Sequence, residues 1–248
     1  MDEIKSALEG PPGYLTGLSF RPEELALVRE RIRAQWLERI GEVSPEARAK
    51  FEQLPMNRYH ELCHLVDHKA LWPKPRRILR PEVVEEIRAT SLLKTFEGEF
   101  GSFVISDEED LGYEEMYWRL VRPNSASDVG PLHADAWFWE LGHGLAPGGH
   151  QRVKVWISIY CETGKNGLRF VPGSHKRSWR YHGEHRDGFV KPVFDEEEKD
   201  LDIHMFDSQA GDAIVFHDRL LHGGAPGGGT TRVSLEFTMF VRNERYFT

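Results

Sequence analysis

The chain has 248 residues, of which 29% are charged and 40% hydrophobic, and its formal net charge is −8 with a pI near 5.9. This acidic balance argues against a nucleic-acid-binding protein, which neutralises phosphates with a basic face. No apolar run approaches the roughly 20 residues that cross a membrane, and residues 1–5 lack the features of a signal peptide. Cys63 and Cys161 lie far apart in no metal-type spacing, so we expect a cytoplasmic protein without a disulfide framework.

The first third of the chain has the hydrophobic spacing of helices. Between Glu23 and Ile40 apolar side chains recur every three or four residues, and Pro22 suits the first turn of a helix. Further helices are predicted over residues 45–54, 57–71 and 81–89, and Pro73 and Pro75 end the second of these.

After about residue 94 the sequence changes to short strands separated by glycine-rich turns. Strands are predicted over residues 115–122, 153–160, 213–216 and 232–241. The second and fourth alternate strictly between apolar and polar side chains, so each has one face that can pack on the helices and one that lines a wet interior.

This pattern predicts a mainly β fold with N-terminal helices, namely a jelly-roll barrel (a double-stranded β-helix) that helices brace on one sheet. We expect a single domain over residues 1–248. Residues 1–93 would form its mostly helical part, and residues 94–248 would form the jelly-roll core.

A candidate metal site begins at His133-Ala134-Asp135. In a strand, residues two apart point to the same face, so one strand would aim an imidazole and a carboxylate at one point. His222 would bring a third ligand from a distant strand, and His217 competes for that role. Two histidines and one carboxylate form the facial triad of non-heme Fe(II) oxygenases. A His-x-Asp tripeptide is a weak signal by itself in a chain with 12 histidines, so the order of the parts carries the prediction.

Ten residues beyond His222, Arg232 and Ser234 share one face of the last predicted strand. A guanidinium and a hydroxyl on the same face are what an anionic co-substrate needs beside a metal.

A rival motif lies in the helical part. His60-Glu61-Leu62-Cys63-His64 satisfies the H-E-x-x-H pattern of zinc proteases, and His68 continues the same stripe. The Gly-x-x-His continuation is absent, although the following helix carries Glu82, Glu85 and Glu86. We interpret the motif as the surface of an amphipathic helix.

Six ordered segments resemble the phytanoyl-CoA dioxygenase-like branch of the Fe(II)/2-oxoglutarate-dependent oxygenases. The segments are PLHAD (131–135), VWIS (155–158), NGLRFVPGSHK (166–176), GDAIVFH (211–217), LHGG (221–224) and RVS (232–234). The resemblance covers about residues 113–242, and the Asn-Gly to Pro-Gly-Ser-His segment is distinctive of the branch.

The resemblance implies roles for individual residues. His133, Asp135 and His222 would be the iron ligands, and His222 is preferred to His217 because the following Gly-Gly and the spacing to Arg232 match the family. The remaining implied contacts are those of 2-oxoglutarate: Arg232 on its distal carboxylate, Ser234 as a further donor, Trp156 on the cavity wall, and Arg119 or Arg122 as an additional polar contact.

The implied activity is an iron- and 2-oxoglutarate-dependent dioxygenase that uses O2 and releases succinate and CO2. Halogenating relatives have a small residue in place of the carboxylate, so Asp135 favours hydroxylation of an unactivated C–H bond. Two alternatives stay open: a cupin-like metal-dependent enzyme without 2-oxoglutarate, and a non-catalytic ligand-binding barrel.

The expected substrate is a polar small molecule of the natural-product, sugar or amino-acid type, anionic or ring-bearing. Its candidate contacts are Trp137, Phe138 and Trp139 directly after the metal motif, and the basic segment at 175–191.

Overall fold

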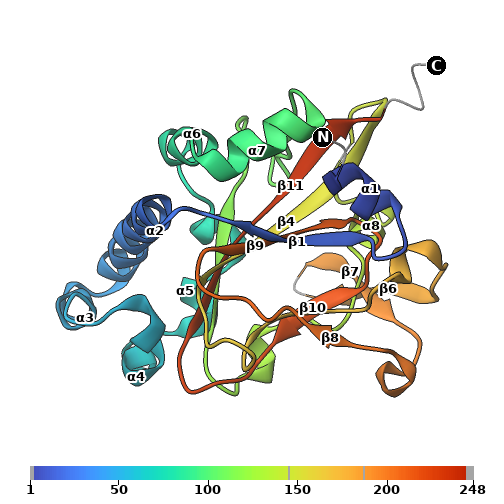
Figure 1. Ribbon diagram of the computed structural model, residues 1–248. Helices are drawn as coiled ribbons and strands as arrows, with labels where there is room; N and C mark the ends of the chain where they lie inside the picture. Colours follow the sequence, from blue (N-terminus) through green and yellow to red (C-terminus); the bar gives the residue numbers. More distant parts are fainter. Residues whose placement is uncertain (1–2, 145, 187, 244–248) are drawn as a thin grey trace.

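The computed structural model describes residues 3–144, 146–186 and 188–243. Two larger antiparallel β-sheets and a two-stranded one form most of the C-terminal part, and most of the helices lie on the outer side of the largest sheet (Figure 1). The arrangement is the predicted jelly roll with N-terminal helices, although the described strands do not hydrogen-bond into a closed barrel. No described helix has the length and apolar character of a membrane span.

Eight α-helices are described: α1 (Glu3–Glu9), α2 (Pro22–Val43), α3 (Pro45–Phe51), α4 (Tyr59–Leu62), α5 (His68–Leu71), α6 (Pro81–Arg88), α7 (Ser91–Phe100) and α8 (Asp135–Glu140). Six short 3-10 turns accompany them: η1 (Met56–Arg58), η2 (Cys63–Leu65), η3 (Lys74–Arg77), η4 (Ala126–Asp128), η5 (Ser174–Lys176) and η6 (Glu198–Asp200).

Helix α2 confirms the periodicity seen in the sequence. Pro22 occupies its first turn, and the Glu24 carboxylate accepts a hydrogen bond from the Arg21 backbone N–H at 2.9 Å. The apolar stripe of the helix is buried throughout in the main core; it consists of Leu25, Val28, Ile32, Trp36 and Ile40.

The helix predicted over 57–71 is broken into two short helices. Helix α4 ends at Leu62, the turn η2 follows, and α5 begins only at His68. Asp67 causes the new start, because its carboxylate accepts a hydrogen bond from the Ala70 N–H at 3.1 Å and so caps α5. His60 and His64 therefore do not share one continuous helix.

The larger sheet has the strand order β1-β9-β4-β11-β2, and β3 also pairs with β11. Its strands are β1 (Tyr14–Ser19), β2 (Val104–Ile105), β3 (Tyr117–Val121), β4 (His150–Tyr160), β9 (Asp212–His217) and β11 (Arg232–Arg242). The smaller sheet has the order β10-β5-β8, with β5 (Gly167–Phe170), β8 (His204–Met205) and β10 (His222–Ala225), and β6 (Tyr181–Arg186) forms a hairpin with β7 (Phe189–Phe194).

The helical part does not stop at residue 93, where the sequence predicted the boundary, and it also contains a strand. Helix α7 continues to Phe100, and the N-terminal part supplies the edge strand β1, which pairs with β9. The sequence shows no alternation for β1 because the pairing register shifts between Leu15 and Leu18, where Gly17 has φ of 83°. One hydrophobic cluster contains side chains of both the helices and the large sheet. The single-domain organisation stays a prediction.

The central strands β4, β11 and β3 have two chemically different faces, as the alternation predicted for the first two. The apolar face packs on the helices in the main core; from β4 and β11 it contains Val153, Val155, Ile157, Ile159, Val233, Leu235, Phe237, Met239 and Val241. The polar face points toward the smaller sheet and carries Tyr117, Arg119, Lys154, Trp156, Arg232, Ser234 and Glu236. The antiparallel register places Glu236 of β11 between Tyr117 of β3 and Trp156 of β4.

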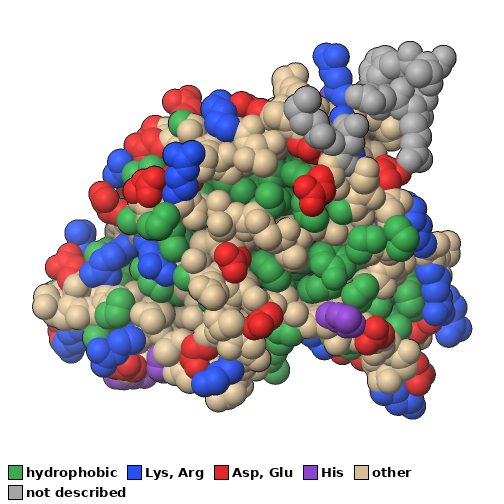
Figure 2. Space-filling model, viewed as in Figure 1, with side chains coloured by type: hydrophobic (Ala, Val, Ile, Leu, Met, Phe, Trp, Pro, Cys, Tyr) green, Lys and Arg blue, Asp and Glu red, His purple; other side chains and the backbone are tan. Residues whose placement is uncertain are grey.

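Charged side chains of both signs are interspersed over the helical side of the molecule (Figure 2). Several form ion pairs within or between helices, such as Arg48 with Glu52 at 2.9 Å and Arg31 with Glu86 at 2.6 Å. Exposed pairs of this kind contribute little to stability, about 0–1 kcal/mol each. The packing of the helices on the sheet therefore depends on the apolar stripes.

We expect the substitution Ile32→Ala to lower the free energy of unfolding by about 2–5 kcal/mol, because Ile32 is fully buried between α2 and the sheet and its loss leaves a cavity. Denaturant unfolding of the purified protein measures the change. Glu30→Ala on the exposed side of the same helix is the control and should change stability by no more than about 0.5 kcal/mol. Equal effects of the two substitutions would contradict the packing described for α2.

Candidate active site

His133 and His222 face each other across an isolated antiparallel bridge. The His133 N–H donates to the His222 carbonyl and the His222 N–H to the His133 carbonyl, both at 2.9 Å. The two imidazole rings lie on the same side of the bridge with their centroids 4.5 Å apart. A backbone pair thus sets the spacing of two predicted ligands that are far apart in the chain.

Asp135 reaches the same point by a different route from the one predicted. The sequence suggested one strand for His133 and Asp135, but Asp135 is the first residue of helix α8. Ala134 is extended, with φ of −108° and ψ of 136°, and the helical turn follows it. The turn, and not strand periodicity, swings the carboxylate back toward the two imidazoles.

The three side chains place their ligand atoms close together. Asp135 Oδ1 is 3.7 Å from His133 Nε2, and Asp135 Oδ2 is 3.6 Å from His222 Nε2. All three ligand atoms lie within 4.8 Å of one another, and no other such group of histidine, cysteine or acidic residues occurs in the described ranges. Asp135 Oδ2 is buried and has no hydrogen-bond partner there, which fits a metal ligand.

Backbone carbonyls orient both imidazoles for metal binding. His133 Nδ1 donates to the Pro131 carbonyl and His222 Nδ1 to the Leu220 carbonyl, each at 2.9 Å. Because a carbonyl only accepts, each Nδ1 carries the proton and each Nε2 lone pair points toward Asp135. Burial lowers the pKa of His222 to about 4, so this imidazole is neutral at physiological pH, as a metal ligand must be.

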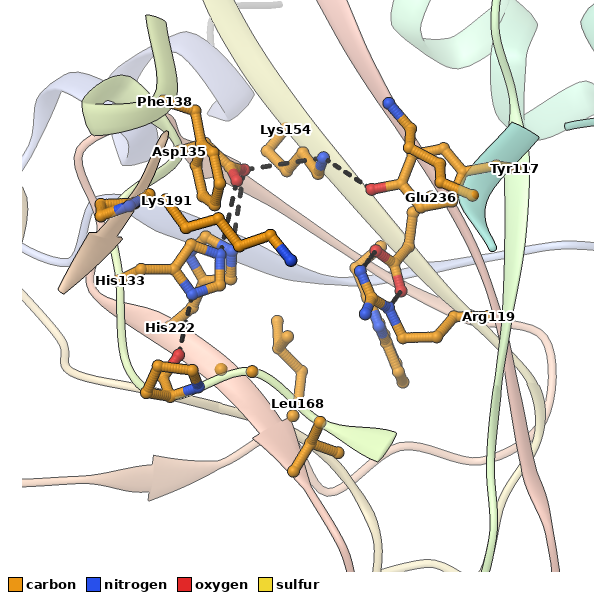
Figure 3. A pocket seen from close by; sticks show the side chains of 18 of the residues that line it. Tyr117, Arg119, His133, Asp135, Phe138, Lys154, Leu168, Lys191, His222 and Glu236 are labelled. Atoms are coloured by element: carbon orange, nitrogen blue, oxygen red, sulfur yellow. Dashed lines mark hydrogen bonds and ion pairs between the residues drawn. The ribbon is translucent and has the colours of Figure 1, made fainter. Parts of the chain in front are cut away.

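Lys154 stands beside the triad and was not singled out by the sequence. Its Nζ lies 3.7 Å from Asp135 Oδ2 and 3.4 Å from the Tyr117 hydroxyl, as Figure 3 shows. Burial would lower the pKa of Lys154, but Asp135 and the nearby acidic groups raise it well above its usual value. Burial likewise would raise the pKa of Asp135, but Lys154 and the two imidazoles keep it well below its usual range.

Arg232 is a buried cation whose charge no protein group balances directly. It is 1% exposed, and none of its three guanidinium nitrogens has a hydrogen-bond partner among the described residues. Burial lowers its pKa to about 10, so it stays charged at neutral pH. An unpaired charge in such a place costs several kcal/mol, and an anion bound in the cavity would offset that cost.

Gly224 lies close beside Arg232, where a larger residue would crowd it. A Cβ atom added at Gly224 would lie 3.2 Å from Arg232 Nη2 and 2.7 Å from Val129 Cγ1. Trp156, which is 2% exposed, lies beneath the guanidinium with its ring centroid 5.6 Å from the Arg232 Cζ atom. Trp156 also lines the cavity, as the resemblance implied.

The other predicted polar contacts lie in different places. The Ser234 hydroxyl donates to Glu236 Oε1 at 2.8 Å, so its expected contact with a co-substrate stays a prediction. Arg119 lines the cavity and pairs with Glu236 at 3.1 Å, whereas Arg122 pairs with Asp128 at 2.8 Å away from the cavity lining. His217 interacts with Asp218 and does not belong to the triad.

A cavity of about 560 Å³ joins the triad to Arg232. Among the described residues its lining is strongly basic: Lys74, Arg77, Arg119, Lys154, Arg186, Lys191 and Arg232 stand against only Asp135 and Glu236. The whole chain carries a net charge of −8, so the cavity has the opposite sign to the molecule. Such a local field concentrates anions at the entrance.

The aromatic run after the metal motif contributes one side chain to the cavity. Phe138 lines it and packs edge-on against the His133 ring at 5.5 Å. Trp137 instead stacks on Tyr181 at 4.5 Å, and Trp139 packs edge-on against Phe240. Trp137 and Trp139 lie outside the cavity lining, because the run is helical and successive side chains turn away from one another, so their contact with a substrate stays a prediction.

The basic segment at 175–191 reaches the cavity through its second half. This half forms most of the β6–β7 hairpin, from which Arg186 and Lys191 line the cavity. His175, in the first half, is buried with its ring 5.2 Å from that of His217. The rival H-E-x-x-H motif forms no metal group: His60 Nδ1 interacts with the Thr231 hydroxyl at 3.0 Å.

Comparisons with known proteins agree with this geometry. The family described as phytanoyl-CoA dioxygenase matches residues 20–232. No curated protein sequence matches the chain.

Solved structures of low sequence identity share the fold. SnoK, a non-heme alpha-ketoglutarate-dependent carbocyclase from nogalamycin biosynthesis, is 13% identical with a TM-score of 0.56, covering 97% of this chain and 84% of its own. EctD from S. alaskensis is 14% identical with a TM-score of 0.55, and the match covers 97% of this chain and 76% of the EctD chain. AviO1 from Streptomyces viridochromogenes Tue57 is 17% identical with a TM-score of 0.52, and the match covers 97% of this chain and 96% of the AviO1 chain.

The family match extends over most of the chain and includes every residue of the triad, together with Arg232. The chain therefore belongs to the phytanoyl-CoA dioxygenase family of non-heme Fe(II)- and 2-oxoglutarate-dependent oxygenases.

Proposed function

We propose that this protein binds Fe(II) through His133, Asp135 and His222 and hydroxylates an unactivated C–H bond of a polar small molecule with 2-oxoglutarate as co-substrate. One observation carries the proposal. Three converging ligand atoms and a buried, unpaired Arg232 line the same cavity. The donor set suits Fe(II), since two imidazoles and one carboxylate leave positions open for co-substrate and O2.

When bound, iron would supply two linked reactions. O2 would oxidise 2-oxoglutarate to succinate and CO2, and one oxygen atom would be inserted into the substrate C–H bond. The protein supplies orientation. The carbonyls of Pro131 and Leu220 hold the two imidazoles with Nε2 toward the metal position, and Arg232 would pair with the distal carboxylate of the co-substrate. Phe138 and Trp156 add apolar surface to the cavity wall.

Two relatives support the co-substrate. The EctD structure contains 2-oxoglutarate and 5-hydroxyectoine, and the epimerase SnoN, with a TM-score of 0.53 and 16% identity, is in complex with Fe3+, alpha-ketoglutarate and a nogalamycin compound. Their substrates differ in size and chemistry, so neither substrate is transferred to this chain.

The alternatives fit the cavity less well. A cupin-like enzyme without 2-oxoglutarate leaves Arg232 buried with its charge unbalanced. A ligand-binding barrel without catalysis has no need of three converging metal ligands.

The substrate itself is proposed to be anionic, since Arg186 and Lys191 of the β6–β7 hairpin add positive charge to the cavity. Phe138 is the aromatic surface available to a ring.

We expect Fe(II) and 2-oxoglutarate, added together without oxygen, to produce a weak visible charge-transfer band, because both would coordinate one iron. His222→Ala should abolish the band and succinate formation while leaving the fold intact, since it removes one ligand from the metal. His217→Ala is the matched control, as this histidine lies outside the triad, and should retain both. A band that survives His222→Ala but is lost in His217→Ala would show that the wrong third ligand was named.

We expect Arg232→Met to weaken 2-oxoglutarate binding to the iron-loaded protein by at least about tenfold, because a charge-assisted pair worth about 1.5–3 kcal/mol is lost. Without 2-oxoglutarate the variant should be no less stable than the wild type, because methionine removes an unbalanced buried charge. Titration of the charge-transfer band and thermal unfolding measure the two effects. Arg242→Met, exposed at the end of the same strand, should change neither. Unchanged 2-oxoglutarate affinity in Arg232→Met would refute the assigned role.

A further inference from the structure

We propose that Lys154, Arg77 and Tyr117 form a second anion subsite, which binds an oxyanion of the substrate, either a carboxylate or a phosphate-type group. We call these three side chains the Tyr117 wall. The assignment rests on the proposed function, because it concerns the charge left in the cavity once iron and 2-oxoglutarate are in place. All three residues line the cavity that contains the triad.

The Tyr117 ring brings the two cations together. Tyr117 is 6% exposed and lies on the cavity face of β3. Lys154 Nζ is 3.4 Å from its hydroxyl and 5.6 Å from its ring centroid, and the Arg77 Cζ atom is 5.9 Å from the same centroid. Figure 3 shows Lys154 reaching from the triad toward Tyr117. The wall therefore extends from Asp135 along the side of the cavity that β3 and β4 form.

Arg77 is held rigidly but is not neutralised. Its Nε donates to the Trp72 carbonyl at 2.9 Å and its Nη1 to the Trp118 carbonyl at 2.5 Å. No described carboxylate forms an ion pair with it, although it is only 8% exposed. Two backbone carbonyls thus fix the position of the guanidinium and leave its full charge in the cavity wall.

The direct ion-pair partner of Lys154 is a predicted iron ligand. Asp135 is the one carboxylate within ion-pairing distance of Lys154 in the described part of the chain, at 3.7 Å. A metal bound to Asp135 would draw on that carboxylate's charge, so the ammonium would lose much of its compensation. Loading the metal thereby creates a demand for another anion next to Lys154.

Three of the other cations of the cavity wall have acidic partners, and Arg186 is one of them, with Glu184 at 3.4 Å. Arg119 pairs with Glu236, and Lys74 pairs with Glu108 at 2.7 Å and Glu115 at 2.6 Å. Arg232 is reserved for 2-oxoglutarate under the proposed function. Arg77 and Lys154 are therefore the two cations beside Tyr117 that a substrate anion would neutralise.

An oxyanion fits the donors of the Tyr117 wall. Lys154 is a compact point charge, Arg77 presents a planar guanidinium, and the Tyr117 hydroxyl can donate to an oxygen. Carboxylates and phosphates share this pattern of acceptor oxygens. The two differ in charge, because a phosphate-type dianion would balance both cations whereas a carboxylate would balance one.

The test uses iron-loaded protein with saturating 2-oxoglutarate and no oxygen, titrated separately with methylphosphonate, acetate and the neutral dimethyl sulfone. The thermal unfolding midpoint and the charge-transfer band report binding. We expect at least one anion to raise the midpoint or shift the band, and the sulfone to do neither. Lys154→Met should weaken that anion's binding by about tenfold or more, since one charge-assisted contact is lost.

Two further variants separate charge from packing. Arg77→Lys keeps the charge and should retain anion binding, whereas Arg77→Met should weaken it by a similar factor. Arg77→Met could fail to fold because the Trp72 and Trp118 carbonyls lose their donor. In that case the anion affinity of Lys154→Met decides whether the subsite exists. Lys94→Met, exposed on α7, is the matched control and should bind anions like the wild type.

The outcomes distinguish this subsite from the proposed function. Preference for methylphosphonate identifies a phosphate-type substrate group, and preference for acetate identifies a carboxylate. If the band forms with 2-oxoglutarate but neither anion has an effect, or if Lys154→Met binds the anion as the wild type does, the subsite is refuted while the proposed function stands. If the band never forms, the proposed function fails, irrespective of anion binding.

Discussion

The antiparallel pairing of β11 with β4 and β3 is the constraint on which the rest of the molecule depends. Because side chains alternate along a strand, this pairing sorts three strands into one apolar and one polar face. The apolar face seals the core against α2, and the polar face provides one wall of the cavity. A shift of register by one residue would bury Arg232 in the helical core and expose Val233 to the cavity, so the hydrophobic contact with the helices also sets the position of the chemistry.

The opposite side of the cavity depends on a much smaller set of backbone contacts. Two hydrogen bonds join His133 to His222, and a helical turn returns Asp135 to them. The Pro131 and Leu220 carbonyls then decide which nitrogen of each ring faces the metal position. The larger sheet therefore supplies Arg232 and Lys154, while the bridge between His133 and His222 and the first turn of α8 hold the metal ligands, and the cavity lies between them.

Only some of the positive charges that line the cavity are balanced by carboxylates. Glu236 neutralises Arg119 in the middle of the polar face, and its pKa is held at about 2 by Arg119 and Lys154 against the opposing effect of burial. Arg232 on one side of this pair and Arg77 on the other have no carboxylate partner among the described residues. Two separated, unbalanced cations suit two different anions, which is the charge pattern expected for a co-substrate and a substrate held at once.

The sequence by itself determined the fold class and the two-faced strands, since alternation and helical spacing are local properties that follow from where side chains point. The candidate triad was predicted from its residue types and their order, although His133 and Asp135 do not share a strand. Arg232 could also be predicted from the sequence, through its place on an alternating strand. Only the tertiary structure decided that Asp135 begins a helix, that Phe138 and not its tryptophan neighbours faces the cavity, and that β1 joins the large sheet. It also decided the roles of Lys154 and Arg77. A lysine on a polar strand face is usually solvated, and Arg77 lies in a short turn with no periodic pattern. Their meeting at Tyr117 depends on long-range pairing, which no local feature of the chain encodes.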